Sequence, residues 1–193
     1  PTPGYSSILM NLQLFAAIFF LTIFPLHLAP AENIGKDEAL RYWGQWRGPL
    51  GTGVAPKADP PIEWSETKNI RWKISLPGRG HSTPVIWGDR VFLTTAVPYG
   101  DEFKPIPVNS KGAHDLVPVK HRYKFIVLAV NRRDGKILWQ KTVREDLPHE
   151  GGHITASLAS ASTVTDGKLL FAYFGSWGLY CLDLDGNLKW QTD

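Results

Sequence analysis

Short runs of alternating hydrophobic and polar residues, rich in β-branched and aromatic side chains, fill the C-terminal part of the chain. Asp166-Gly167 and Asp185-Gly186 separate some of these runs. Runs of this period around Asp-Gly pairs predict antiparallel strands joined by hairpins. The type I′ turn expected there requires positive φ at both central residues. The predicted strands cover Ser162–Thr165, Lys168–Phe174, Gly178–Leu184 and Asn187–Gln191.

The same pattern occurs once earlier in the chain. Residues 82–93 align with residues 160–171, and Trp139, preceded by Asp134-Gly135, aligns with Trp190. Four short strands repeated about every 40–50 residues are typical of β-propeller blades, so we predict an all-β propeller. Each blade needs a neighbour, because one sheet alone cannot bury both of its faces. The earlier strands are expected at Pro84–Trp87, Arg90–Ala96, Phe125–Val130 and Lys136–Val143.

The tryptophan segments identify a family. The first segment, residues 129–139, fits the pattern Ala-x-Asp-x-x-Thr-Gly-x-x-x-Trp at Ala129, Gly135 and Trp139. Asn131 and Asp134 replace the Asp and Thr of this pattern. The second segment is one residue shorter and keeps Asp183, Gly186 and Trp190, with Asp185 before the glycine. This is the repeat motif of PQQ-like (quinoprotein-type) β-propellers, and the chain resembles BamB-like exported members of that family over residues 42–193.

The resemblance implies a domain organisation. Residues 32–68 are expected to form an N-terminal extension, and residues 69–193 part of a propeller. Residues 69–76, around Trp72, would be the outer strand of the closing blade. One blade would cover residues 82–143, with an insertion at 97–124, and the next residues 160–193. Because a closed propeller has typically 4–8 blades, we expect the chain to be the N-terminal part of a longer protein.

The first 31 residues have the pattern of a signal peptide. They contain no Lys, Arg, Asp or Glu, and the apolar run Leu14–Leu26 ends shortly before Ala29-Pro30-Ala31. This pattern predicts cleavage after Ala31 and export to the periplasm or the extracellular space. The alternative is an uncleaved segment, which would be the chain's sole contact with a membrane. Nucleic acid is not expected as a partner of an exported protein.

Composition excludes two classes of protein. With 12% aromatic residues and a net charge of +3, the chain is too apolar and too weakly charged to be disordered. Cys181 is the sole cysteine, so there is no disulfide framework. It occupies the small-residue position of the tryptophan motif, where we expect a buried structural thiol.

Histidines supply the candidate ligand residues. His149-Glu150-Gly151-Gly152-His153 fits the H-E-x-x-H zinc pattern, which needs a helix to bring both His to one face. The two glycines at its centre and Pro148 before it disfavour a helix, so we predict a loop that connects two blades and not a zinc peptidase site; incidental metal binding is left open. His81 and His153 each precede the first strand of a blade. Because that strand lines the channel of a propeller, both are candidates for ligand contact; His121 is a further candidate.

Basic residues gather between positions 120 and 144. With period-two strands they are expected to form a solvated outer face, and binding to an anionic glycan is the alternative. The residues are Lys120, Arg122, Lys124, Arg132, Arg133, Lys136, Lys141 and Arg144.

Two functions follow from the resemblance. The first is a non-catalytic scaffold that binds an envelope or extracellular protein, or a glycan. The second is a PQQ-dependent dehydrogenase of alcohols or sugars, which would hold pyrroloquinoline quinone (PQQ) and calcium at the propeller centre. Many such enzymes carry an adjacent cysteine pair over the cofactor, and Cys181 stands alone. We therefore expect a scaffold with no catalytic, cofactor or metal residues among those present.

Overall fold

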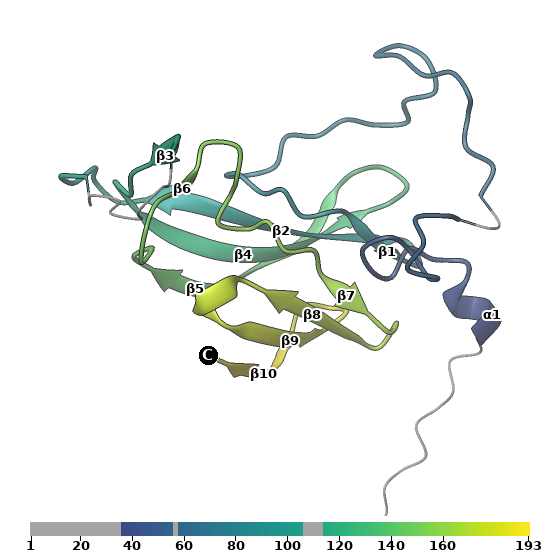
Figure 1. The fold of residues 1–193 in the computed structure, drawn as a ribbon. Coiled ribbons are helices and arrows are strands. Elements are labelled where there is room, and N and C mark those ends of the chain that lie inside the picture. The colour runs from purple at the N-terminus through teal and green to yellow at the C-terminus, as the bar shows by residue number, and fades with distance from the viewer. Residues whose placement is uncertain (1–35, 56–57, 106–113) are drawn as a thin grey trace, which may run out of the picture. The chain divides into compact units, whose positions relative to one another are not determined.

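The computed structural model describes residues 36–55, 58–105 and 114–193, which belong to one compact unit (Figure 1). The predicted signal peptide, residues 1–31, lies outside the described residues. Within the described residues, no helix is long and apolar enough to cross a membrane. The helices described are the single turn α1 (Lys36–Ala39) and the 3₁₀ turn η1 (Gly175–Trp177).

Two four-stranded antiparallel sheets form the fold and confirm the all-β prediction. The first has the order β1-β2-β4-β5 and the second β7-β8-β9-β10, so each follows the chain in a simple meander. The strands of the first sheet are β1 (Val85–Trp87), β2 (Arg90–Tyr99), β4 (Arg122–Asn131) and β5 (Ile137–Asp146). Those of the second are β7 (Val164–Thr165), β8 (Leu169–Tyr173), β9 (Leu179–Asp183) and β10 (Leu188–Thr192).

The connection between β2 and β4 is shorter than the insertion predicted at 97–124. The two strands stay paired as far as Tyr99 and Arg122, so three expected loop residues on each side belong to the ladder. The connection also contains a strand of its own, β3 (Leu116–Val117), which pairs with β6 (Gly152–His153). This two-stranded sheet joins the insertion to the segment that leads into the second sheet.

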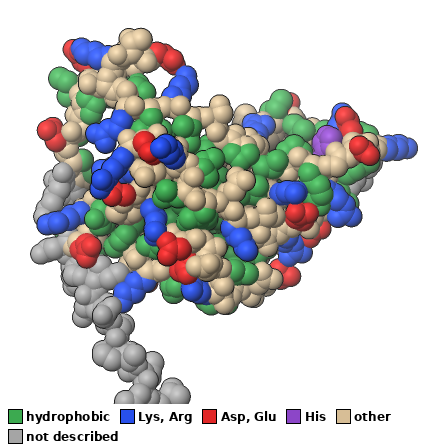
Figure 2. Space-filling model, turned by 180° about the vertical axis from the view of Figure 1, so that it is seen from behind, with side chains coloured by type: hydrophobic (Ala, Val, Ile, Leu, Met, Phe, Trp, Pro, Cys, Tyr) green, Lys and Arg blue, Asp and Glu red, His purple; other side chains and the backbone are tan. Residues whose placement is uncertain are grey.

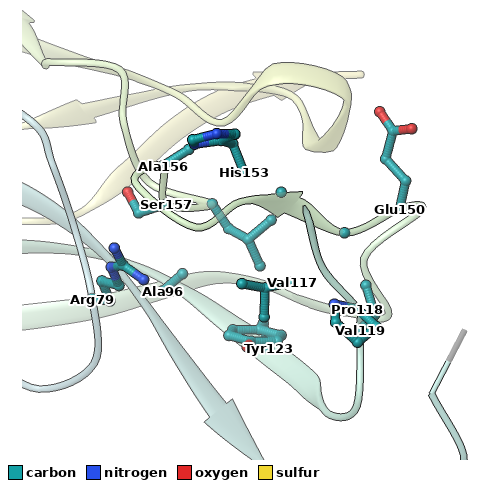
Figure 3. A pocket seen from close by; sticks show the side chains of 13 residues that line it. Arg79, Ala96, Val117, Pro118, Val119, Tyr123, Glu150, His153, Ala156 and Ser157 are labelled. Carbon is teal, nitrogen blue, oxygen red and sulfur yellow. The ribbon is translucent and has the colours of Figure 1, made fainter. Parts of the chain in front are cut away.

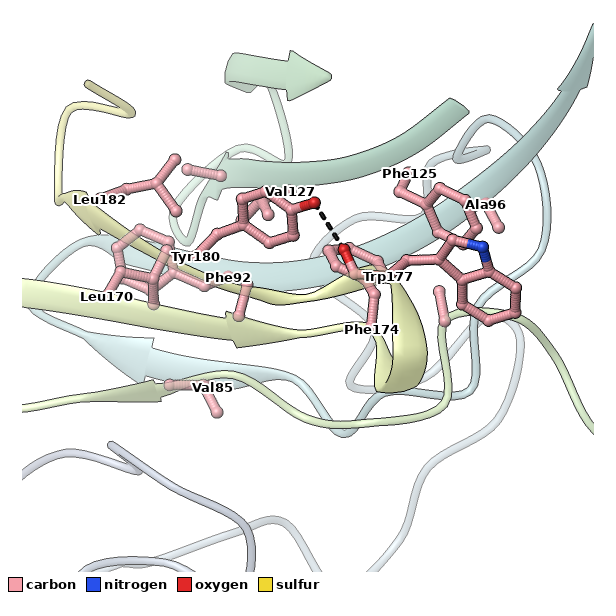
Figure 4. Close-up of a cluster of buried hydrophobic side chains, with 13 residues drawn as sticks. Val85, Phe92, Ala96, Phe125, Val127, Leu170, Phe174, Trp177, Tyr180 and Leu182 are labelled. Carbon is pink, nitrogen blue, oxygen red and sulfur yellow. Dashed lines mark hydrogen bonds between the residues drawn. The ribbon is translucent and has the colours of Figure 1, made fainter. Parts of the chain in front are cut away.

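The two four-stranded sheets pack face to face over one hydrophobic core (Figure 4). Phe125 of β4 lies at its centre, with its ring 4.9 Å from that of Trp177 and 5.4 Å from that of Phe174. The buried Tyr180 hydroxyl donates a hydrogen bond of 2.6 Å to the carbonyl of Trp177. Each sheet therefore buries one face against the other, as neighbouring blades must.

The opposite face of the first sheet is covered by residues 72–74. Leu128 and Val130 of β4 are fully or almost fully buried there, and Trp72 and Ile74 pack against them. Residues 69–76, expected as the outer strand of the closing blade, form no strand here, so their pairing in that blade stays a prediction. A strand is defined by its hydrogen-bonded partner, and no described segment pairs with this one. The segment instead covers the sheet with its side chains.

The Asp-Gly turns also differ from the prediction. Gly135, Gly167 and Gly186 have φ of 77°, 90° and 86°, but the aspartates before them do not have positive φ. A type I′ turn needs both, so these turns are of another type with one left-handed glycine. A register shift lies beside the first turn, after Ala129, and beside the third, after Leu188.

The N-terminal extension packs on β1 and β7, the first strand of each four-stranded sheet. Ile86 of β1 donates its N–H to the carbonyl of Trp43, and Thr165 of β7 donates to the carbonyl of Gly44, both over 2.8 Å. Two consecutive carbonyls of the extension therefore join β1 to β7.

Candidate functional site

The tryptophans of the repeat motif connect successive repeats. The indole Nε1 of Trp72 donates to the carbonyl of Arg132 at 2.9 Å, and that of Trp139 donates to the carbonyl of Leu184 at 3.0 Å. In both cases the ring lies on the glycine of the following turn. A Cβ added to Gly135 would lie 2.8 Å from the Trp72 ring, and one added to Gly186 would lie 2.8 Å from the Trp139 ring.

The small residues of the motif are buried opposite its tryptophans. Trp139 lies opposite Ala129 in the ladder, and Trp190 lies opposite Cys181, so the two buried small residues are equivalent. Burial raises the pKa of the Cys181 thiol, which fits a structural role. Trp190 is 44% exposed, with its ring 6.0 Å from that of Phe171.

The acidic residues of the motif accept backbone hydrogen bonds within the turns and form ion pairs. Asp183 Oδ1 accepts the N–H groups of Asp185 and Asn187 at 3.0 and 2.9 Å, while Lys189 lies 2.8 Å from Oδ2. The side chains of Lys189 and Asn187 hold the pKa of Asp183 far below its ordinary value. Asp185 pairs with Arg90, and Asp134 Oδ1 accepts the N–H of Lys136 at 3.1 Å.

The segments before β1 and β7 lie side by side, as the position of His81 shows. His81 donates its backbone N–H to the carbonyl of Ala159 at 3.0 Å, and its side chain is exposed. Ser162 accepts the N–H of Thr83 at 2.9 Å, and Ser160 donates to the carbonyl of Ser157 at 2.8 Å. The hydroxyls of Ser160 and Ser162 therefore form hydrogen bonds with backbone groups.

These two segments do not fit a calcium–quinone site. Calcium takes six to eight oxygen ligands and usually several carboxylates. Residues 79–87 and 157–165, which include β1 and β7, contain no Asp or Glu. The hydroxyls of Ser160 and Ser162 there are already bonded to backbone groups.

A pocket of about 130 Å³ lies where β2 and β4 meet the β3–β6 sheet (Figure 3). His153 lines it, whereas His81 does not, so the two histidines predicted as ligand candidates do not share this pocket. Arg79 lines it instead and donates from Nη2 to the carbonyl of Ile154 at 2.7 Å. The pocket is lined by both apolar and charged side chains, among them Tyr123, Val117 and Glu150 (Figure 3).

The H-E-x-x-H segment forms no zinc site of its own. His153 lies in strand β6, while His149 Nδ1 lies 3.0 Å from the hydroxyl of Ser176 and its ring stacks on Trp177 at 5.1 Å. The helix that the pattern requires is not formed.

One grouping was missed by the sequence analysis. Ligand atoms of His114, Asp115 and His153 all lie within 4.8 Å of one another. In the sequence, only the adjacent His114 and Asp115 of the insertion indicated this grouping, because His153 lies far away along the chain. His121, the third histidine singled out, has a buried Nδ1 without a hydrogen-bond partner among the described residues.

A second hollow, of about 400 Å³, lies between the extension and β1. Tyr42, Trp43, Pro60 and Arg132 are among the residues that line it. None of the predicted ligand residues does, so the pocket beside His153 is the better candidate site.

Comparison with known proteins agrees with this geometry. The family model described as outer membrane protein assembly factor BamB matches residues 57–193, a range that includes both four-stranded sheets. No curated protein matches the chain significantly. The family match covers well over half of the sequence, and the structure shows repeated four-stranded sheets linked by the motif tryptophans. The chain therefore belongs to the BamB-type family of PQQ-like repeat β-propellers.

Proposed function

We propose that this protein is an exported, non-catalytic propeller that binds envelope proteins and assists their assembly. The observation that carries the proposal is the family match, whose description is an outer membrane protein assembly factor. Export agrees with the signal-peptide pattern of residues 1–31. The partner would meet the protein in the periplasm or at the outer membrane.

The pocket beside His153 supports binding of a protein rather than of a cofactor. Sites for small molecules and cofactors have volumes of roughly 300–1,000 Å³. The volume here, about 130 Å³, suits one side chain of a partner. Val117, which is 46% exposed, presents an apolar surface to that side chain, while Arg79 and Glu150 supply polar contacts.

The charge pattern favours a protein partner over an anionic glycan. Of the basic residues between 120 and 144, five form ion pairs: Lys120 with Glu102, Lys124 with Glu145, Arg133 with Asp89, Lys136 with Asp134, and Arg144 with Asp146 and Asp193. Figure 2 shows basic and acidic side chains lying next to one another over one face of the molecule. Paired charges attract a polyanion weakly, because each carboxylate cancels the field of its partner.

The experiment that tests the proposal measures binding of an unfolded outer-membrane protein to the full chain. A fluorescently labelled β-barrel protein is diluted from urea, and its anisotropy is followed as the full chain is added. We expect saturable binding that Val117→Glu weakens about tenfold, because a charge replaces an apolar contact in the pocket. Val54→Glu, a change at a valine that is 58% exposed in the extension, serves as the control and should leave binding unchanged. An absence of binding, or equal loss in both variants, would contradict the proposal.

A further inference from the structure

A second feature lies at the same end of the molecule and has a different chemistry. His114 and Asp115 come from the insertion, and His153 comes from β6, yet one ligand atom of each lies within 4.8 Å of the others. The rings of His114 and His153 meet edge to face with their centroids 5.7 Å apart. Two imidazoles and a carboxylate are a ligand set that Zn²⁺ and neighbouring transition metals prefer.

Each histidine ring has a polar neighbour: for His114 it is the carboxylate of the cluster itself, and for His153 it is Thr155. His114 Nδ1 lies 3.1 Å from Asp115 Oδ2, and His153 Nδ1 lies 2.8 Å from the hydroxyl of Thr155. The backbone N–H of Thr155 also donates to His153 Nδ1 at 3.2 Å, so Thr155 holds this ring in place. Metal-bound histidines commonly have a second partner that fixes the orientation of the ring.

The backbone holds the two halves of the cluster together. Leu116 pairs with His153 in the β3–β6 ladder, and Ile154 donates its N–H to the carbonyl of Asp115 at 2.8 Å. The side chains of His114 and Asp115 are 79% and 69% exposed, so an ion can reach them and keep water in its remaining positions. Glu150 lines the adjoining pocket and adds a negative charge that favours a cation.

We propose that His114, Asp115 and His153 bind a zinc ion that fastens the insertion to β6. The two-stranded β3–β6 sheet has only two residue pairs and is weak alone. A metal bound across it links segments far apart in sequence and stabilises the folded state in proportion to its occupancy. With three protein ligands, the zinc ion keeps an open position at the mouth of the pocket.

The test is titration of the full chain with ZnCl₂, followed by calorimetry and by the melting temperature. We expect one ion per chain and, at a hundredfold excess over Kd, a rise in Tm of about 5 °C. His114→Ala and His153→Ala should each weaken binding at least about tenfold. His149→Ala is the matched control and should bind zinc like the original chain. CoCl₂ should give visible absorption bands that depend on the same two histidines.

Melting in EDTA shows whether the variants are folded. His114→Ala should melt in EDTA at the temperature of the original chain, because its side chain is exposed. Zinc binding that persists unchanged in His114→Ala and His153→Ala would overturn the proposal. So would an absence of binding at 100 µM zinc, or equal loss in the His149→Ala control. None of these outcomes depends on the outer-membrane protein assay.

Discussion

At the scale of single residues, each of two motif tryptophans packs directly on the glycine of the next repeat. Trp139 donates to the carbonyl of Leu184, and its ring occupies the place where a Cβ of Gly186 would be. Trp72 makes the same pair of contacts with Arg132 and Gly135. Glycine is required at these positions both for its positive φ and for the close approach of the ring.

Gly186→Ala should therefore destabilise the fold in two ways. The left-handed φ of 86° costs an alanine about 1–2 kcal/mol, and the clash with Trp139 adds about 1–3 kcal/mol. Gly53→Ala is the matched control, because Gly53 has φ of 84° but nothing within 4 Å of an added Cβ. Urea unfolding of both variants measures the difference. Equal losses of unfolding free energy would show that the ring contact contributes nothing.

At the scale of elements, the strands were predictable where the pattern is local. Both four-stranded sheets occupy the predicted stretches, because alternation and turn residues act over a few neighbouring positions. The β3–β6 sheet was not predictable, since two-residue strands have no period and their pairing spans distant segments. The same long-range pairing assembles His114 with His153, so that grouping was missed too. Residues 69–76 form no strand, and their place as the outer strand of the closing blade stays a prediction, because the other strands of that blade are not among the described residues.

The turn between β9 and β10 predicts a pH dependence. Lys189 and Asn187 lower the pKa of Asp183 in the folded state, so this carboxylate stabilises the fold above its unfolded pKa, near the ordinary 3.8. That stabilisation is lost as the pH falls further and the carboxylate takes up a proton. Asp183→Asn should lower Tm at about pH 7, and the difference from the original chain should shrink below about pH 4. A Tm difference that stays constant from about pH 7 to about pH 2.5 would contradict this role.

At the scale of the whole molecule, stability depends on the packing of one sheet against the other. Phe125 is fully buried between them, against Phe174 and Trp177. Phe125→Ala should cost about 3–5 kcal/mol, because it leaves a cavity where the two sheets meet. Leu138→Ala, at a side chain that is 46% exposed, should cost far less. Urea unfolding compares them, and similar losses would mean that the sheets do not depend on this core.

The repeat of this family is named for the cofactor PQQ, and we propose that this chain binds proteins rather than PQQ. The most direct test is titration of the full chain with PQQ in the presence of Ca²⁺, followed by the absorbance of the quinone and by Tm. We expect no spectral change and no rise in Tm at saturating PQQ, from a protein that melts cooperatively. A calcium-dependent shift of the quinone absorbance together with a higher Tm would show that the chain binds the cofactor and would overturn the proposed function.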